Sequence, residues 1–597
     1  MRAALGALRK ALLEAEAGSA AVLDRVPPEN LASARNLVHY LELRRHDLRA
    51  LQGELTEHGL SSLGRCEAHA LATLDAVIGV LDCLEGAGAW DARPNPGFAE
   101  SRRVQAMRTE ALLGDHPAER TARLMVTAPS EAAENPALLE QMLAAGMECL
   151  RINCAHDDPG AWEAMIGNAR RAEERTGRPC RIQMDLAGPK LRTGPLPPGP
   201  AVVKVRPQRD ELGRVVEPAR VWLTAAERPA APPQPASATL PVPGAWLAAL
   251  PGSGSLRLRD ARGRRRVMKL AGGAEGGRWA LLQRTAYILE GTIVSLEDAT
   301  PLSAAVGPLT PLPGSLRVRP GDTLRLTRRQ DGGDPARQAI PCTLGEVFGA
   351  VRPGEPIWFD DGRIGGTIGA TGADEVQVHV SHTRPNGGRL RADKGINLPE
   401  TDLSAGAVSP PDEHVLALAA RDADAVGLSF AERADDLHRA RAILDREGGA
   451  HVGIVLKVET DRGFRALPEL LLAGLEHGAP VGVMIARGDL AVECGYERLA
   501  EVQEEILWLA EAAHVPVIWA TQVLESLAKT GQPSRAEITD AAMAARAECV
   551  MLNKGPRVLD AIRTLDDVLV RMDDHQRKKQ SLLRELRSFP EVGVPAA

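Results

Sequence analysis

The chain has 597 residues, of which 44% are hydrophobic and 25% charged, with a net charge of −7 and a pI near 6.1. This length is too great for one ordinary hydrophobic core, and the composition is typical of a soluble globular protein with two to four domains. The acidic balance argues against nucleic acid as a partner, and no apolar run approaches the ~18 residues needed to cross a membrane.

The first 23 residues combine Arg and Ala as a transit peptide does, but Glu14 and Glu16 count against a targeting segment. We therefore expect an ordinary helix here and a cytoplasmic protein. The eight cysteines include no Cys-x-x-Cys pair, which is typical of reduced thiols that are mostly buried.

Residues 1–116 are predicted to form an N-terminal α-helical extension. Apolar residues recur at helical spacing in residues 29–59 and again in residues 61–84. No pattern in this region points to chemistry, so we interpret it as helices that pack or oligomerise.

From residue 117, short apolar segments alternate with amphipathic ones. Such alternation predicts parallel strands joined by helices, and eight units predict an α/β fold, a closed (β/α)₈ TIM barrel, in residues 117–194 and 394–575. Residues 576–597 are expected to be a frayed C-terminal tail. The predicted strands are 124–128, 149–153, 181–186, 424–430, 453–459, 481–487, 515–522 and 549–553.

Residues 195–393 interrupt the barrel after its third strand. They are rich in Pro, Gly and Arg and contain short alternating strands, which predicts an inserted β-rich domain. Within this domain, the Pro- and Ala-rich residues 226–244 are predicted to be a flexible linker or an irregular loop.

Polar side chains stand at the ends of five of the predicted strands. The strand ends and the loops after them build the active site of such a barrel, and side chains two apart on a strand share a face. We therefore expect these side chains to lie together. They are Arg151 and Asn153, Asp185, Lys457 and Glu459, Arg487 and Asp489, and Thr521.

This mixture of fixed cations and carboxylates suits a divalent metal ion and a phosphorylated anion. Carboxylates hold Mg²⁺, whereas Arg and Lys neutralise phosphate oxygens. The turn at Gly488 and Asp489 offers backbone N–H groups at a helix start to a substrate carboxylate. Each charged residue alone could equally belong to a structural ion pair, such as Lys457 with Glu459. Five strand ends with complementary charge together favour a site.

Seven further segments stand out along the chain. They are RINCAHDD (151–158), MDLAGPKLRTG (184–194), IWFDDGRI (357–364), DKGINLPETDL (393–403), LKVET (456–460), MIARGDLAVE (484–493), and IWATQVLESL (518–527) with QPSRAEITDAA (532–542). In this order they resemble the motifs of the pyruvate kinase family. The resemblance covers residues ~120–194 and ~314–570 and implies a barrel with a mobile β lid after the third strand. It also implies transfer of a phosphoryl group from phosphoenolpyruvate to ADP, giving pyruvate and ATP in glycolysis.

The resemblance implies roles for individual residues. Lys457 and Arg151 would contact the transferred phosphoryl group, and Thr521 would lie where the enolate is protonated, as catalytic residues. Glu459 and Asp489 would hold Mg²⁺ or Mn²⁺. The implied substrate-binding residues are Arg151, Lys457, Gly488, Asp489 and Thr521; the nucleotide-binding ones are Asn153, His156, Arg192, Pro129 and Lys394; and Asp361 belongs to the lid.

One departure from the family concerns its monovalent-cation site. Ala155 and Leu186 stand where the family has Ser and Thr, and Lys190 stands where it has Glu. Because a tethered ammonium can replace a bound K⁺ electrostatically, we expect the enzyme not to require K⁺, with Lys190 as the substitute.

Other departures concern the loops and the ends of the chain. Residues 551–556, MLNKGP, are shorter than the family's loop after the eighth strand and lack its Ser, Glu and Thr. The lid has about 110 extra residues, roughly 203–313, and the N-terminal helices are also extra. The family's C-terminal regulatory domain, and with it the usual sugar-phosphate effector site, is expected to be absent. We expect a homo-oligomer.

Two alternatives to a working kinase stay open. The first is another barrel enzyme acting on phosphoenolpyruvate or a 2-oxo acid, such as an enolate-forming lyase, although a lyase needs no ADP site. The second is a non-catalytic phosphoenolpyruvate-binding or regulatory relative, in which the altered loop at 551–556 has ended turnover.

Overall fold

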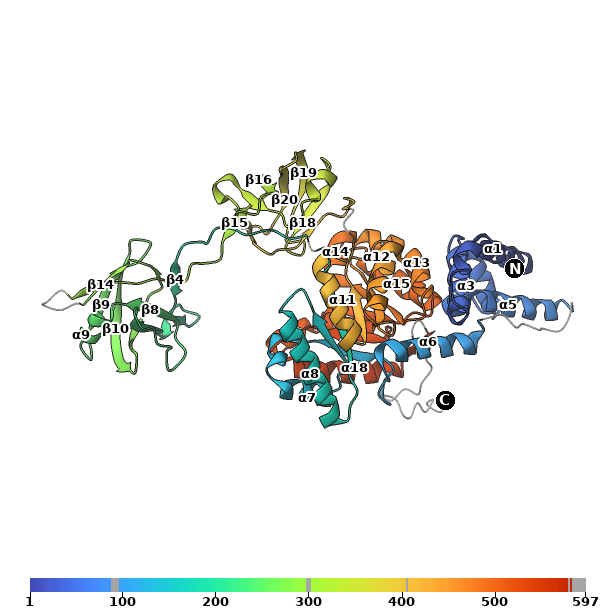
Figure 1. Ribbon diagram of the computed structural model, residues 1–597, viewed down its shortest axis with the longest axis horizontal. Helices are drawn as coiled ribbons and strands as arrows, with labels where there is room; N and C mark the ends of the chain where they lie inside the picture. The colour runs from blue at the N-terminus through green and yellow to red at the C-terminus, as the bar shows by residue number, and fades with distance from the viewer. Residues whose placement is uncertain (87–95, 190, 297–301, 404–405, 578–579, 582–597) are drawn as a thin grey trace, which may run out of the picture. The chain divides into compact units, whose positions relative to one another are not determined.

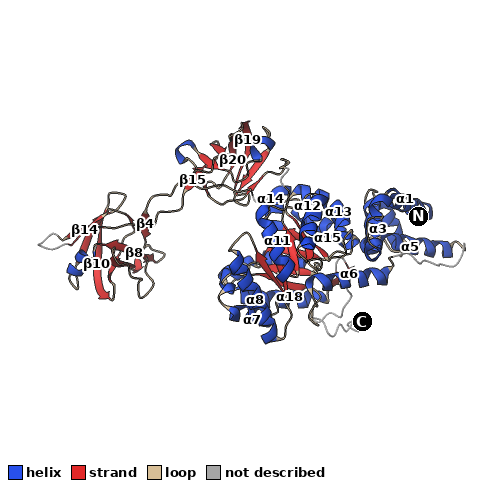
Figure 2. Ribbon diagram, viewed as in Figure 1, coloured by secondary structure: helices blue, strands red, loops and turns tan. Residues whose placement is uncertain are grey.

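The computed structural model describes residues 1–86, 96–189, 191–296, 302–403, 406–577 and 580–581. The chain divides into two compact units (Figure 1). Helices are concentrated in the first unit, and the second is built almost entirely from strands (Figure 2). The first comprises Met1–Leu191, Gly349–Ile368 and Gly395–Ala597, and the second comprises Arg192–Phe348 and Gly369–Lys394. Gly349–Ile368, expected in the inserted domain, thus groups with the barrel.

Eight parallel strands close into a barrel in chain order, which confirms the predicted fold. Most of their residues are buried, because helices cover the outside and side chains fill the inside, and this explains their nearly continuous apolar runs. The strands are β1 (Arg123–Thr127), β2 (Cys149–Asn153), β3 (Arg181–Asp185), β23 (Ala425–Leu428), β24 (Gly453–Val458), β25 (Val481–Ala486), β26 (Val517–Val523) and β27 (Cys549–Leu552).

Helices follow the barrel strands, and several begin at a side-chain cap. Asp158, Thr460 and Ser534 each accept a hydrogen bond from a backbone N–H in the first turn of the following helix. These caps fix the loops that leave the strand ends. The helices are α7 (Pro136–Ala144), α8 (Pro159–Thr176), α11 (Pro410–Asp422), α12 (Ala434–Arg446), α13 (Asp461–Leu475), α14 (Arg487–Cys494), α15 (Leu499–Ala512), α16 (Glu525–Thr530), α17 (Arg535–Ala544) and α18 (Val558–Asp573).

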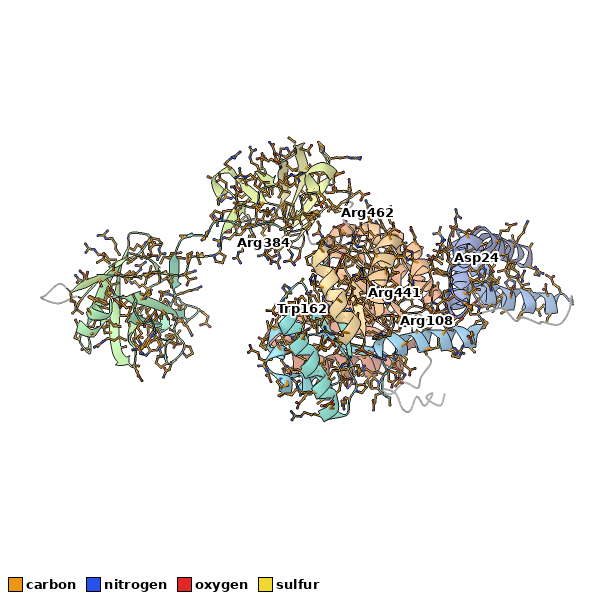
Figure 3. All side chains as sticks on the ribbon, viewed as in Figure 1. Asp24, Arg108, Trp162, Arg384, Arg441 and Arg462 are labelled. Atoms are coloured by element: carbon orange, nitrogen blue, oxygen red, sulfur yellow. The ribbon has the colours of Figure 1, made fainter. Side chains whose placement is uncertain are left out.

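The N-terminal region is helical and packs on the barrel helices α13 and α15. The buried amide of Asn36 donates to the carbonyl oxygens of Glu67 (2.7 Å) and Ala512 (2.8 Å). Arg108, labelled in Figure 3, donates to the carbonyl oxygen of Ala513 at 2.8 Å. The helices are α1 (Arg2–Gly18), α2 (Ala20–Leu23), α3 (Pro28–Leu43), α4 (Arg49–Glu57), α5 (Ala70–Leu84) and α6 (Phe98–Leu113).

The end of α6 fills the amino-terminal mouth of the barrel. Leu112 and Leu113 form one buried cluster with side chains from the barrel strands, among them Cys149 at the start of β2. A Cβ atom added at Gly453 or at Gly482 would overlap the side chain of Leu112. The two glycines therefore make room for this leucine, and the N-terminal region is part of the barrel core.

His514 lies in the contact between the N-terminal helices and the barrel. Its ring is fully buried, with Nδ1 2.9 Å from Ser33 Oγ and Nε2 2.8 Å from the carbonyl oxygen of Ala68. Because a carbonyl oxygen only accepts, Nε2 carries the proton. Burial lowers the pKa of His514 to about 4, so the ring is neutral near pH 7.

This histidine predicts an acid-sensitive contact. Its unfolded pKa is about 6.5, so its contribution to stability is present above pH 6.5 and is lost as the pH falls toward 4. Between pH 7 and pH 5 the loss is expected to be about 2 kcal/mol. In His514→Asn, where Asn tolerates the positive φ of 52°, that part of the loss should vanish. Urea unfolding at both pH values measures the free energy of unfolding. His58→Asn, at an exposed histidine, is the matched control. Equal losses in wild type and His514→Asn would contradict the assignment.

The second unit has its own hydrophobic core beneath a seven-stranded sheet. Its strands, in spatial order, are β14 (Ser303–Ala305), β13 (Ile293–Leu296), β9 (Ser255–Arg259), β10 (Arg265–Ala274), β11 (Gly277–Leu282), β7 (Ala219–Ala225) and β8 (Ala238–Val242). The remaining strands within this unit are β4 (Val202–Val205), β5 (Gln208–Arg209), β6 (Val215–Glu217), β12 (Ala286–Leu289), β15 (Ser315–Val318), β16 (Thr323–Thr327), β17 (Ala339–Pro341), β20 (Glu375–His382) and β21 (Gly388–Arg391).

The predicted linker at 226–244 is wrong at its C-terminal end. Ala238–Val242 forms β8, which pairs in parallel with β7, and helix α9 (Gly244–Ala249) follows. The Pro-rich composition concealed the strand, since β8 is an edge strand and an edge tolerates Pro241.

Some segments complete the description. β18 (Pro356–Phe359) and β22 (Ile396–Asn397) belong to the first unit, and β19 (Ile364–Thr371) runs from the first unit into the second. Of the tail expected to fray, only β28 (Gln576–Arg577) and β29 (Gln580–Ser581) are among the described residues. None of the helices in the described ranges is long and apolar enough to cross a membrane.

Candidate active site

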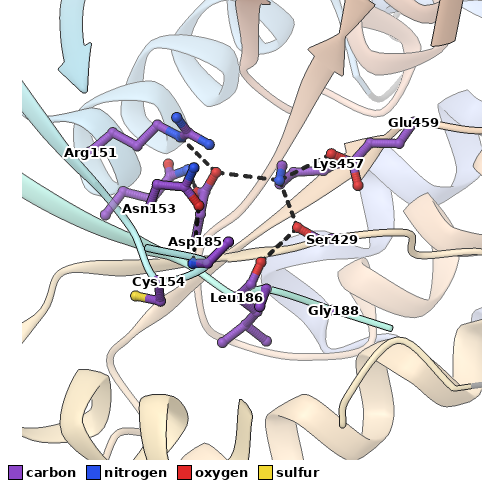
Figure 4. Close-up of polar contacts among 12 residues, drawn as sticks. Arg151, Asn153, Cys154, Asp185, Leu186, Gly188, Ser429, Lys457 and Glu459 are labelled. Carbon is purple, nitrogen blue, oxygen red and sulfur yellow. Dashed lines mark hydrogen bonds and ion pairs between the residues drawn. The ribbon is translucent and has the colours of Figure 1, made fainter. Parts of the chain in front are cut away.

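Arg151, Asp185 and Lys457 meet at the carboxyl-terminal ends of β2, β3 and β24 (Figure 4). Arg151 Nε donates to Asp185 Oδ2 at 2.7 Å, and Lys457 Nζ lies 3.4 Å from the same oxygen. Arg151 also donates through Nη1 to Thr127 Oγ1 at 3.1 Å. The structure therefore brings together three of the side chains that the sequence placed at strand ends.

Asp185 is fully buried beneath these two cations. Burial by itself would raise the pKa of its carboxyl. The positive charges of Arg151 and Lys457 outweigh burial, so the pKa of Asp185 lies well below its ordinary value. Asp185 is thus a permanent anion that fixes the positions of both cations.

Lys457 is the centre of the buried network. Its Nζ lies 3.1 Å from Glu459 Oε1 and donates to Ser429 Oγ at 2.6 Å. Burial alone would lower the pKa of Lys457, but Glu459 and Asp185 raise it above its ordinary value. The ammonium therefore stays charged at physiological pH.

Ser429 is a site residue that the sequence analysis missed. Its hydroxyl is completely buried, accepts from Lys457 and donates to the carbonyl oxygen of Leu186 at 2.8 Å. Its position at the end of a predicted strand, 424–430, was the only signal in the sequence, because a single Ser carries no charge pattern.

Glu459 directly follows β24, which ends at Val458 instead of at 459 as predicted. Its Oε2 accepts from the backbone N–H of Phe430 at 2.9 Å, while Oε1 faces Lys457. Phe430 has a φ of 55°, which turns the backbone after β23 and aims this N–H at the carboxylate.

Thr521 has an unusual backbone conformation within β26. Thr521 and Gln522 have φ values of 63° and 61°, in the left-handed region that a β-branched residue rarely adopts. Arg487 holds this strained segment, since its guanidinium donates to the carbonyl oxygen of Thr521 and pairs with Asp540. Strain of this kind is typical of functional sites.

The Gly488 N–H, which the sequence offers to a substrate carboxylate, has a partner within the chain. It donates to Thr521 Oγ1 at 3.0 Å. Asp489 lies half-buried in the first turn of α14, two residues from Arg487.

The donor set suits a metal ion shared with a substrate. Within the described part of the chain, no group of three or more His, Cys, Asp or Glu side chains is arranged to hold a metal by itself. Mg²⁺ is commonly bound by one or two carboxylates together with substrate oxygens, so Glu459 and Asp489 fit Mg²⁺ in that mode.

A cleft of about 250 Å³ opens beside Arg151. Gly555 packs so closely on Ala528 that a Cβ atom would overlap its carbonyl oxygen, and the short loop after β27 is held against α16. The altered loop thus supplies two polar side chains to the cleft. The lining residues are Thr127, Ala128, Arg151, Ile152, Asn153, His156, Asp157, Met165, Glu525, Lys529, Asn553 and Lys554.

The remaining predicted residues are distributed over both units. Pro129 directly precedes the short helix Ser130–Ala133, and Asp361, with a φ of 56°, lies between β18 and β19. Arg192 and Lys394 belong to the second unit, where Arg192 pairs with Asp393 at 2.5 Å. Lys190 lies outside the described residues.

The profile of the family "Pyruvate kinase, barrel domain" matches residues 119–213 and 310–555, together more than half of the chain. The chain belongs to the pyruvate kinase family. The match spans all eight barrel strands and omits all seven strands of the seven-stranded sheet and all of helices α1–α6.

Similar proteins include several pyruvate kinases. The one from Thermococcus litoralis is 34% identical over 257 residues, which is 43% of this chain and 51% of that protein. The one from Geobacillus stearothermophilus is 28% identical over 267 residues (44% of each chain), and that from Corynebacterium efficiens 32% over 243 residues (40% and 48%). The chain spans about half the length of the curated relatives it matches.

Proposed function

We propose that this chain is a pyruvate kinase that transfers the phosphoryl group of phosphoenolpyruvate to ADP, giving pyruvate and ATP in the cytoplasm. The observation that carries the proposal is the buried Lys457, held at the strand ends by three partners beside Arg151. Phosphoryl transfer needs fixed positive charge and little covalent chemistry from the protein, and this network supplies such charge.

The residues divide the work by position. Lys457 and Arg151 neutralise negative charge on the oxygens of the phosphoryl group during its transfer. Asp185 keeps both side chains in place. Thr521 lies next to Gly488 at the seventh strand end, where its hydroxyl can orient a water that protonates the enolate. Glu459 and Asp489 would hold Mg²⁺, which when bound stabilises charge on the enol and phosphoryl oxygens.

The nucleotide is proposed to enter the cleft beside Arg151. Asn153 and His156 line it, Pro129 would lie near the base, and the second unit would act as the lid, bringing Arg192 and Lys394. Asp361 would belong to the lid. Closure of a lid excludes water from the transferred group. We also propose a homo-oligomer.

Turnover is expected not to depend on K⁺. Pyruvate formation from phosphoenolpyruvate, ADP and Mg²⁺ should proceed at the same rate, within about twofold, in potassium and in tetramethylammonium salts of equal ionic strength. A many-fold rise on adding K⁺ would refute this expectation and with it the role of Lys190 as a cation substitute. Pyruvate release without ADP would indicate a lyase instead.

A non-catalytic relative is the second candidate, favoured by the altered loop at 551–556. Binding of phosphoenolpyruvate without any ADP-dependent product would support it. Calorimetric titration with phosphoenolpyruvate, run beside the turnover assay, separates the two functions.

A further inference from the structure

Gln183 is a buried amide inside the barrel to which no role has been given. It is 3% exposed and lies on β3 two residues before Asp185, so both side chains share the inward face. Its Nε2 donates to Asp185 Oδ1 at 2.6 Å, and its Oε1 has no hydrogen-bond partner. An ionised carboxylate only accepts, so the NH₂ group must face Asp185.

Gln183 completes the coordination of the buried anion. Arg151 and Lys457 occupy Asp185 Oδ2, and Gln183 occupies Oδ1. A Cβ atom at Gly427 would overlap Oδ1, so the backbone of β23 closes the adjacent side. Both oxygens of Asp185 thus have donors of the chain as their partners.

The neighbouring acceptors are also occupied by donors of the chain. The carbonyl oxygen of Leu186 accepts from Ser429 Oγ at 2.8 Å, and Asn153 Oδ1 accepts from the backbone N–H of Ala155 at 3.2 Å. Leu186 and Ala155 are the positions to which the family resemblance assigns a monovalent-cation site. Each of these oxygens therefore already spends one lone pair on a hydrogen bond within the chain.

We propose that Gln183 is a positioning residue that takes the place of a bound monovalent cation. Its amide fixes Asp185, and Asp185 in turn fixes Arg151 and Lys457. The unpaired Oε1 fits this role. A buried acceptor without a hydrogen bond costs free energy, so an amide with such an acceptor is retained where its NH₂ group is needed. The inference rests on the proposed function and adds a structural cause for K⁺ independence that does not involve Lys190.

The test compares two variants of Gln183. Gln183→Ala removes the donor and leaves space beside Oδ1, whereas Gln183→Leu removes the donor and keeps the space filled. In tetramethylammonium salt, both are expected to turn over about tenfold more slowly than wild type. In potassium salt, Gln183→Ala should regain most of the lost turnover rate and Gln183→Leu little of it. The rate of wild type should be the same in both salts. If the substitutions merely disturbed packing, each variant would turn over equally slowly in the two salts.

Crystals soaked in rubidium chloride give a readout that needs no turnover. An anomalous peak beside Asp185 is expected in Gln183→Ala and not in wild type. A rubidium peak there in wild type would overturn the inference, as would a Gln183→Ala variant that matches wild type in both salts.

The two proposals fail in different ways. If wild type makes no pyruvate from phosphoenolpyruvate and ADP, the proposed function fails, and the rubidium peaks still decide the inference. If wild type is active but the variants do not respond to K⁺ as described, the inference alone fails. Should Gln183→Ala not fold, the wild-type rubidium map decides it: a peak beside Asp185 contradicts the inference, and an empty site supports it.

Discussion

Replacing Lys457 with Met is expected to reduce ADP-dependent pyruvate formation about a hundredfold to a thousandfold. The buried ammonium lies 3.1 Å from Glu459 and 3.4 Å from Asp185, and loss of one preorganised charge in a water-excluded site commonly costs about 10²–10³ in rate. The substitution also leaves two buried carboxylates without their shared partner, and breaking a buried ion pair destabilises by about 3–5 kcal/mol. The change in rate must therefore be measured on protein shown to be folded.

The matched control is Lys269→Met, which makes the same substitution at an exposed lysine of β10 in the second unit. Steady-state turnover and thermal unfolding are measured for both variants. We expect Lys269→Met to keep wild-type turnover. A folded Lys457→Met protein that turns over at more than about a tenth of the wild-type rate would contradict the assigned role of Lys457.

Replacing Leu112 with Ala is expected to destabilise the first unit by about 2–5 kcal/mol, the usual range for a large-to-small change in a packed core. Leu112 is 2% exposed and lies against Gly453 and Gly482 at the barrel mouth. Neither glycine has a side chain that could move into the space left behind, so a cavity should persist. Urea unfolding followed by circular dichroism measures the change.

Leu84→Ala is the matched control, since Leu84 is 76% exposed at the end of α5. A surface substitution of this kind should change the free energy of unfolding by less than about 0.5 kcal/mol. Similar, small effects for the two leucines would show that the N-terminal helices are an appendage and do not complete the barrel core.

The sequence alone determined the barrel and the location of its site. The period and length of the apolar segments are local properties of the sequence, so they predict the strands and helices directly. Eight strand–helix units then predict a closed barrel as the simplest arrangement. The barrel rule then placed Arg151, Asp185 and Lys457 at one end, and the structure brings them within hydrogen-bonding or ion-pairing distance.

The sequence was misleading where the composition of a segment is unusual for the secondary structure that the segment forms. Proline and alanine hid the edge strand β8, because an edge needs few of its backbone N–H groups for pairing. The left-handed turn at Thr521 also brings its hydroxyl to the N–H of Gly488, a contact that the sequence did not indicate. No pattern in one sequence reports which backbone group a distant side chain will reach.

Only the tertiary structure decided which side chains contact the buried charges and which fill the mouth of the barrel. Ser429, Gln183 and Leu112 are uncharged residues with ordinary local patterns, and each matters through a contact far away in the sequence or deep in the barrel. Periodicity specifies which face of an element is buried, but it does not specify which groups meet there. Those contacts depend on how the eight strands close around a shared interior, where each buried polar atom needs a hydrogen-bond partner.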